Sequence, residues 1–318
     1  MVHGCGDGEG GVGKEKIMIT SNVRMLRDTM QIMEQGYYVK DGKRISLKLS
    51  KEEMKKAQVL LPDDVREICS RDDFKQVYSP DVRCVYSCEN ADSFALTRKR
   101  YAQGSYMFGN TDEKEILVLN LANPVKPGGG VRIGEKAQEE DLCRKSSLLL
   151  SLESEEAKEY YLFNQKHGGT RRGSDALIIT PKVEIVRDEK GVLLDDTMIA
   201  AVLTCAAPRV ILGVKGMSDT KFQEMIYNRI LGMLKCAAWF GYRNLVLGAW
   251  GCGAFGNDAY VISNMFYKVL KELETGGSFE EGLFRRVDFA VLDHMRGQYN
   301  FREFCRNFSS EQSISGER

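Results

Sequence analysis

Three consecutive glycines, Gly128 to Gly130, are followed after seven residues by Gln138 and two adjacent glutamates, Glu139 and Glu140. Because glycine has no Cβ, it lets backbone N–H groups approach a ligand closely, and a helix that starts nearby adds the positive end of its dipole. A loop of this kind is suited to binding an anion. The spacing therefore predicts carboxylates beside an anion site.

The presence of two adjacent glutamates at the start of a helix has two explanations. Negative charge in the first turn of a helix is favourable by about 0.3–1 kcal/mol at an exposed site, so the helix alone can account for the pair. Neighbouring helical residues point about 100° apart, however, so one glutamate can face a ligand while the other leans to its side. A carboxyl group that is partly buried beside phosphate retains its proton more strongly and can act as a general acid.

A second glycine loop, with Gly251, Gly253 and Gly256, also lies between an apolar strand and a helix. Two anion-binding loops indicate a diphosphate ligand. The second loop matches the GxGxxG pattern of dinucleotide-binding sites, but the acidic residue expected about 20 residues later would be Glu272 or Glu274, at a helix end. That position argues against a dinucleotide site. The alternative that these glycines only make tight turns is left open.

No metal site and no cofactor are predicted. Cys84 and Cys88 form the one close cysteine pair, and no second Cys or His pair lies near them in the sequence to complete a zinc site. The nine cysteines are odd in number and scattered through apolar segments, which is typical of buried free thiols in a reducing compartment. We therefore expect a cytoplasmic protein.

From about residue 80, apolar strands alternate with helices. This pattern is typical of an α/β sheet covered by helices on both faces, in which ligands bind at the carboxyl ends of the strands. Both glycine loops follow such ends. We expect strands in residues 82–87, 115–122, 175–188, 198–208, 244–250 and 286–293, and helices in residues 92–103, after the glutamates, and in about 219–240 and 258–274.

The chain is long and apolar enough for a large buried core, with 318 residues of which 43% are hydrophobic. Before the core, we expect a helix from Ser21 to Gly36, a hairpin around Asp41 and Gly42, and a capping box that begins at Ser50. The domain prediction is a disordered N-terminus (1–15), an N-terminal extension packed on the core (16–80), the core itself (81–306) and a flexible tail (307–318).

The charge balance of the chain indicates that any polyanionic ligand must be held locally. Lys plus Arg and Asp plus Glu number 45 each, so no global field attracts nucleic acid or an anionic membrane, and direct DNA binding is not expected. The Gly-rich, charged N-terminus lacks the apolar core of a signal peptide, and no stretch of about 18 apolar residues follows. We expect no association with a membrane.

The stretch GGGVRIGEKAQEE resembles the signature of poly(ADP-ribose) glycohydrolases, and the longer form NLANPVKPGGG…AQEEDLCRKSSL resembles the microbial type of that family. The resemblance continues through SDALIITPKVEIVRD, VLTCAAPRV and VLGAWGCGAFGND, and RDTMQIMEQGYY is similar to the helix that precedes the domain in that family. It covers residues from about 20 to 305.

This resemblance implies a macrodomain-like, three-layer α/β/α catalytic core with a mixed central sheet, preceded by an α/β extension. It implies a metal-independent glycosidase that hydrolyses the ribose–ribose O-glycosidic bonds of poly(ADP-ribose) and releases ADP-ribose. The expected partners are poly(ADP-ribose) or ADP-ribosylated macromolecules. Glu140 would then be the acid/base, Glu139 would orient the leaving ribose, and Phe255 would pack on the distal ribose. The substrate-binding residues implied are Asn123, Gly128, Gly129, Gly130, Gln138, Gly251, Cys252, Gly253, Ala254, Phe255 and Gly256.

Two residues depart from the family pattern. Lys126 precedes Pro127, and Arg209 follows the CAAP stretch, where Asn is usual at both positions, so contacts with the distal ribose and the adenine are open. Three other functions are also open: a binding module for ADP-ribose, a hydrolase of single ADP-ribose units, and a nucleotide-binding regulator. The intact Gln-Glu-Glu favours an enzyme, since a pure binding module has no use for Glu140.

Overall fold

The structure is a computed structural model that describes residues 10–72, 74, 84–104, 116–167, 172–210, 219–275 and 283–309, with side chains in the first helix from Ser21 onward. Its centre is a seven-stranded sheet in the order β3-β6-β7-β5-β8-β9-β4. The β3/β6 and β6/β7 pairs are antiparallel and the other pairs are parallel, so the sheet is mixed. The strands are β3 (Gln58–Leu60), β4 (Val85–Glu89), β5 (Leu117–Leu121), β6 (Leu177–Arg187), β7 (Leu193–Cys205), β8 (Asn244–Gly248) and β9 (Arg286–Ala290).

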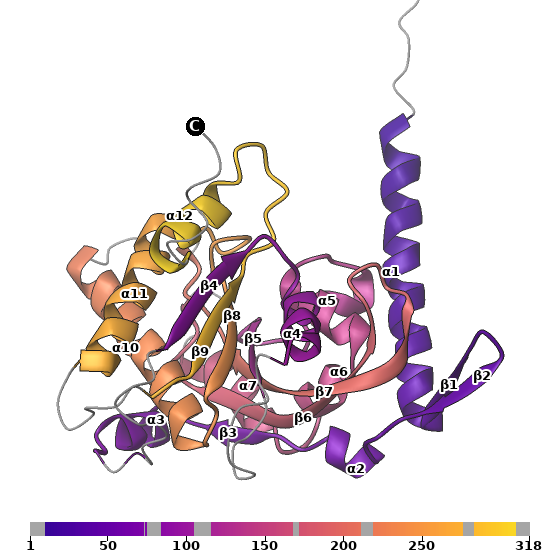
Figure 1. Ribbon diagram of the computed structural model, residues 1–318, viewed down its shortest axis with the longest axis horizontal. Coiled ribbons are helices and arrows are strands. Elements are labelled where there is room, and N and C mark those ends of the chain that lie inside the picture. The colour runs from indigo at the N-terminus through magenta and orange to yellow at the C-terminus, as the bar shows by residue number, and fades with distance from the viewer. Residues whose placement is uncertain are drawn as a thin grey trace, which may run out of the picture.

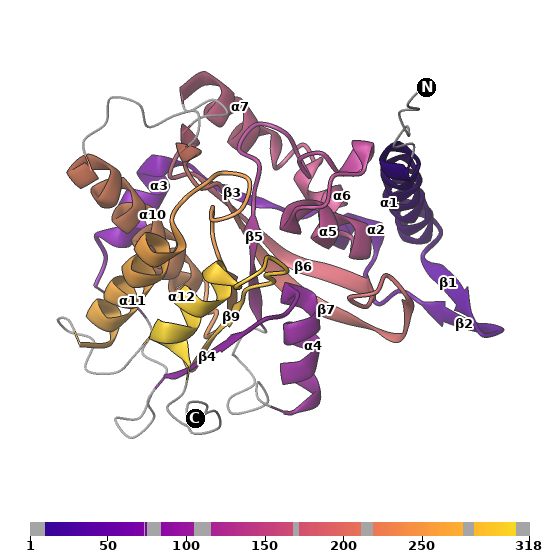
Figure 2. The same ribbon diagram turned by 90° about the horizontal axis from the view of Figure 1, so that it is seen from above.

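Helices cover both faces of this sheet, as Figures 1 and 2 show. Leu117 and Leu119 of β5 pack with one set of helices, whereas Val118 between them packs with the other set, as the two-residue period of a strand requires. The first set is α3 (Pro62–Cys69), α10 (Asp219–Trp239), α11 (Ala259–Thr275) and α12 (Tyr299–Phe308). The second is α4 (Ser93–Ala102), α5 (Gln138–Lys145), α6 (Leu148–Leu152) and α7 (Lys158–His167).

The strands and helices expected after residue 80 are all present, and their ends lie within five residues of the predicted ones. The near-continuous apolar strands β5 and β8 lie inside the sheet and are almost fully buried. Their burial on both faces explains why the apolar runs in the sequence predicted them well.

In the N-terminal part, the turns lie where the sequence predicted them, whereas the start of the first helix and the boundary with the core do not. Helix α1 (Gly10–Gln35) ends at Gly36, which has a φ of +76°, and the hairpin of β1 (Tyr37–Lys40) and β2 (Lys43–Ser46) turns at Asp41 and Gly42. The capping box at Ser50 opens the short helix α2 (Lys51–Met54). However, α1 begins before the expected Ser21 and inside the segment expected to be disordered. Strand β3 also joins the central sheet, so that sheet crosses the predicted boundary at residue 80.

The C-terminal helix α12 extends into the segment predicted as a flexible tail. Phe308 is buried, and its ring stacks on Phe289 of β9 with centroids 4.0 Å apart. The core therefore continues at least to this residue. In the part of the chain described here, no helix has the length and apolar character needed to cross a membrane.

Candidate active site

The two glycine loops lie beside each other because β5 and β8 are parallel neighbours in the sheet. Residues 122–137 connect β5 to α5, and residues 249–258 connect β8 to α11. Both loops therefore emerge at the same edge of the sheet, at the carboxyl ends of their strands, as expected for a ligand site in this class of fold.

Gln138 fixes the start of α5 on strand β5. Its Oε1 accepts a hydrogen bond from the Leu121 N–H at 2.8 Å, and its Nε2 donates to the Leu119 carbonyl oxygen at 2.7 Å and to Ser93 Oγ at 3.1 Å. These bonds place the two glutamates that follow at the strand end. The predicted contact of Gln138 with substrate remains a prediction, since its amide already serves this positioning role.

Glu139 is held through both carboxylate oxygens. Oε2 accepts from the Asn123 N–H at 2.7 Å, and Oε1 accepts from Asn120 Nδ2 at 3.3 Å. The side chain is only 2% exposed. Burial, and then the neighbouring Glu140 carboxylate, raise the pKa of Glu139 to about 8. At neutral pH Glu139 therefore retains its proton.

Glu140 is held through one oxygen only. Its Oε1 accepts from the Gly130 N–H at 2.8 Å, whereas its buried Oε2 has no hydrogen-bond partner among the described residues. A buried, unpartnered carboxyl oxygen is costly to a fold, and a catalytic role is one explanation for it. Glu140 thus has one oxygen fixed by the loop and one oxygen without a partner among the described residues.

The triple glycine makes room for these carboxylates. Gly129 has a φ of +55°, and a Cβ added to it would overlap Glu140 Oε1 and lie 3.1 Å from Glu139 Oε2. A Cβ on Gly128 would lie 2.7 Å from Leu149 Cδ1 in the core. The loop therefore needs glycine in order to pack against α5.

The N–H groups of the first loop already have protein acceptors. The Gly129 N–H donates to the Lys126 carbonyl oxygen at 3.0 Å, and the Gly130 N–H donates to Glu140. The side chain of Asn123 accepts from the N–H groups of Val125 and Lys126, both at 3.0 Å, which closes a tight turn. The contacts predicted between this loop and a diphosphate, including Asn123, remain predictions.

The tip of the second loop has open space and N–H groups without a backbone acceptor among the described residues. Gly251 has a φ of +76°, and a Cβ there would overlap Asn257 Nδ2 and lie 2.6 Å from Ala207 Cβ. By contrast, a Cβ on Gly253 would meet nothing within 4 Å. The N–H groups of residues 253–255 have no backbone acceptor in the described part of the chain. Consecutive free N–H groups can bind an anion.

The other predicted residues of this loop shape its turn or pack against the core. Cys252 is buried, and its N–H donates to the Ala249 carbonyl oxygen at 3.0 Å. The Gly256 N–H donates to the Gly253 carbonyl oxygen at 3.0 Å, which closes the tip, and Ala254 is exposed on it. Phe255 is half-buried against the core.

The sequence did not single out Asn120, which orients Glu139 and also donates to Thr204 Oγ1 on β7 at 3.2 Å. It also missed Asn257, whose Nδ2 donates to the Pro208 carbonyl oxygen at 2.8 Å and so fixes the second loop to the end of β7. An Asn inside an apolar strand is the one signal that could have drawn attention to Asn120.

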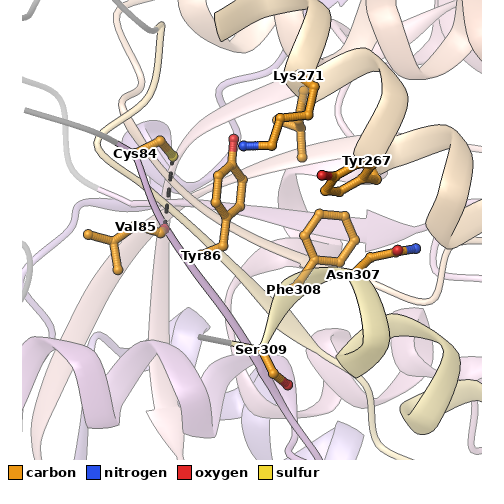
Figure 3. A pocket seen from close by; sticks show the side chains of 9 residues that line it. Cys84, Val85, Tyr86, Tyr267, Lys271, Asn307, Phe308 and Ser309 are labelled. Carbon is orange, nitrogen blue, oxygen red and sulfur yellow. Dashed lines mark hydrogen bonds between the residues drawn. The ribbon is translucent and has the colours of Figure 1, made fainter. Parts of the chain in front are cut away.

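A cavity of about 370 Å³ lies elsewhere, at the amino end of β4 (Figure 3). Lys271 lies over the rings of Tyr86 and Tyr267 there, and Phe308 packs against both tyrosine rings (Figure 3). Because β4 is parallel to β5 through β9 and β8, this cavity is at the opposite edge of the sheet from Glu140. None of the predicted site residues lines it.

The family described as microbial-type PARG, catalytic domain, matches residues 27–188, which is half of the chain. The matched segment contains the triple glycine and both glutamates. The chain belongs to the microbial-type PARG family. No curated protein sequence matches the chain.

Solved PARG structures agree with this assignment. The poly(ADP-ribose) glycohydrolase of Thermomonospora curvata is 28% identical, with a TM-score of 0.78 over 91% of this chain and 100% of that chain. The same enzyme bound to the inhibitor ADP-HPD gives a TM-score of 0.75 at 28% identity, with the same coverage. The enzyme of Deinococcus radiodurans in complex with ADP-ribose is 30% identical, with a TM-score of 0.65 over 81% of this chain and 96% of that chain. The PARG fold confirms the predicted three-layer, macrodomain-like architecture.

Proposed function

We propose that this PARG catalytic domain hydrolyses the ribose–ribose O-glycosidic bonds of poly(ADP-ribose) and releases ADP-ribose, with Glu140 as the acid/base. The observation that carries the proposal is the buried Oε2 of Glu140, which has no partner while Oε1 is fixed by Gly130. The ADP-ribose and ADP-HPD complexes of the two bacterial enzymes support the choice of ligand.

In the first step, Glu140 Oε2 gives its proton to the bridging oxygen of the departing ribose. The bond from that oxygen to the anomeric carbon of the distal ribose breaks, and the ribose leaves as an alcohol. Positive charge develops on the distal ribose, and the neighbouring diphosphate stabilises it. Burial raises the pKa of Glu139 to about 8, so a proton is held on the carboxyl group next to Glu140 at neutral pH.

In the second step, the ionised Glu140 takes a proton from a water molecule, whose oxygen bonds to the same anomeric carbon. Glu140 is then protonated again and ready for the next bond. Most glycosidases divide these tasks between two separated carboxyl groups. Here one carboxyl group serves in both steps, and Glu139, fixed by Asn120 and Asn123, orients the leaving ribose.

The second loop supplies the binding site for the diphosphate in this proposal. The free N–H groups of residues 253–255 donate to the phosphate oxygens, and Phe255 packs on the distal ribose. No cofactor takes part in these steps. Poly(ADP-ribose) or ADP-ribosylated macromolecules are the proposed partners, and the free cysteines of the described chain support a cytoplasmic location.

The test is to incubate the protein with poly(ADP-ribose) on an automodified carrier and to separate the products by chromatography. A carrier with single ADP-ribose units is treated in parallel. The proposal expects free ADP-ribose from the polymer and little release from the single units. Release from the single units alone would show a mono-ADP-ribosyl hydrolase instead, and binding of polymer without any cleavage would show a pure binding module.

A further inference from the structure

Arg209 lies where the end of β7 meets the second loop. The Val210 N–H donates to the Phe255 carbonyl oxygen at 2.9 Å, and Asn257 binds the carbonyl oxygen of Pro208. These two bonds, one on each side of Arg209, fix its backbone against the loop. The position of Arg209 relative to the loop tip is therefore defined by the fold.

The guanidinium of Arg209 has an aromatic contact and no anion. Its central carbon lies 5.7 Å from the centroid of the Phe255 ring, which is within the range of a cation–π contact. Its Nε is buried without a hydrogen-bond partner, and in the described chain no carboxylate pairs with it. A partly buried cation of this kind is stabilised when an anion binds beside it.

A fully buried arginine at this end of β7, Arg229, shows the contrast. Arg229 donates from Nε to Asp175 at 2.9 Å and from Nη1 to the carbonyl oxygens of Arg172 and Ala206. Arg229 is thus satisfied by the protein and serves the fold. Arg209 is not, although it lies beside the same strand end.

Phe255 links Arg209 to the free N–H groups of the loop tip. The N–H of Phe255 is one of the free N–H groups of residues 253–255. Its ring makes the cation–π contact with the guanidinium of Arg209. A guanidinium presents several N–H donors in one plane and binds phosphate through two of them at once. These donors match an anion that has several oxygens, as a phosphate group has.

We propose that Arg209 is a specificity-determining residue that binds a phosphate of the ADP-ribose unit and holds the Phe255 ring against the distal ribose. This inference rests on the proposed function and adds a residue to it. It also explains why a basic side chain is tolerated half-buried at this position. A lysine would supply the charge without the two-point geometry.

The test compares Arg209→Gln, Arg209→Lys and, as a matched control, Arg66→Gln, which alters an exposed arginine on α3 that pairs with Asp63. Calorimetry measures the binding of ADP-ribose and of adenosine, which has no phosphate, and steady-state kinetics measure polymer cleavage. We expect Arg209→Gln to weaken ADP-ribose binding and raise KM by about 10- to 100-fold, because it removes a charge-assisted hydrogen bond. Arg209→Lys should fall between it and wild type.

A role in binding phosphate predicts that kcat changes little, that adenosine binds Arg209→Gln as it binds wild type, and that the Tm is unchanged. Equal losses for adenosine and ADP-ribose, or ADP-ribose binding equal to that of Arg66→Gln, would overturn the assignment. The two proposals fail separately. If wild type does not cleave polymer, the proposed function is wrong, and the two binding measurements still decide whether Arg209 binds phosphate.

Discussion

At the scale of single residues, Glu139 and Glu140 are adjacent and chemically unequal. Both oxygens of Glu139 accept hydrogen bonds, whereas only one oxygen of Glu140 does. The helix geometry that separates them by about 100° directs one carboxyl group to the strand end and the other to the glycine loop. This difference in environment supports the proposed roles, positioning for Glu139 and proton transfer for Glu140.

The raised pKa of Glu139 predicts how stability depends on pH. The value changes from 4.5 to about 8 on folding, so between these values the folded protein binds more protons than the unfolded chain. The contribution of this group to the free energy of unfolding therefore falls as the pH rises from 4.5 to about 8. Denaturant titrations of wild type and Glu139→Gln check this, and the variant should gain stability relative to wild type across that range. A constant difference between the two proteins would contradict the assigned pKa.

Gly129 predicts a local defect in catalysis. Gly129→Ala places a Cβ against Glu140 Oε1 and strains a residue at a φ of +55°, at a cost of about 1–2 kcal/mol. We expect the carboxylate of Glu140 to be displaced, so that polymer cleavage falls much more than the Tm does. Activity assays and thermal unfolding measure the two effects. Full activity in this variant would show that Glu140 does not need its contact with the loop.

At the scale of elements, the two glycine loops differ in what their N–H groups bind. The N–H groups of the loop after β5 donate to the loop's own backbone and to Glu140. In the loop after β8, the N–H groups of residues 253–255 have no backbone acceptor in the described part of the chain. The sequence predicted two equivalent anion-binding loops, because glycine content alone does not show where an N–H points. The contacts of α5, which starts at Gln138, account for the difference.

A substitution at Gly253 tests whether the glycines of the second loop bind a ligand or only form a turn. Gly253→Val adds a side chain in open space, so the free energy of unfolding should stay within about 0.5 kcal/mol of wild type. The same side chain would occupy the position proposed for phosphate, and ADP-ribose binding should fall strongly. Calorimetry and denaturant titration measure the two quantities. Unchanged affinity would mean that these glycines only shape the turn.

Gly251→Ala is the matched control for that variant. At Gly251 a Cβ overlaps Asn257 and the φ is +76°, so this change should destabilise the fold itself. The two glycines lie two residues apart in one loop. Opposite effects on stability and affinity would therefore exclude a general loosening of the loop as the cause of lost binding.

At the scale of the whole molecule, the sequence predicted the elements with strong local signals and missed those that depend on distant contacts. β5 and β8 were predicted because their apolar runs are buried on both faces. β3 has three residues, and its partner in β6 lies more than a hundred positions away, so no local pattern predicts its pairing. The same holds for Phe308, whose burial against Phe289 places the end of α12 in the core.

The candidate site was predictable in its residue types and less so in its geometry. The spacing of the triple glycine and Gln-Glu-Glu located the site, since both follow one strand end. Asn120 and Asn257 were missed because their roles come from neighbouring strands and loops. The unequal hydrogen bonding of the two glutamates also needed the folded loop.

The arrangement of the whole chain predicts insensitivity to chelators. In the described residues, no three His, Cys, Asp or Glu side chains are placed to hold a metal ion. The proposed steps use Glu139, Glu140, water and the N–H donors of the second loop. EDTA should therefore leave the rate of polymer cleavage unchanged in a timed assay. Loss of activity that zinc or magnesium restores would refute this prediction.

The most direct test of the central claim is the rate of polymer cleavage by Glu140→Gln, measured with its affinity for ADP-ribose. The amide keeps the shape of the carboxyl group and cannot give or take the proton, so the rate should fall by about 10²–10⁴-fold while ADP-ribose binds within a few-fold of wild type. Glu52→Gln, which alters an exposed glutamate on α2 that pairs with Lys55, is the control and should cleave normally. If Glu140→Gln keeps more than about a tenth of the wild-type rate, Glu140 is not the acid/base.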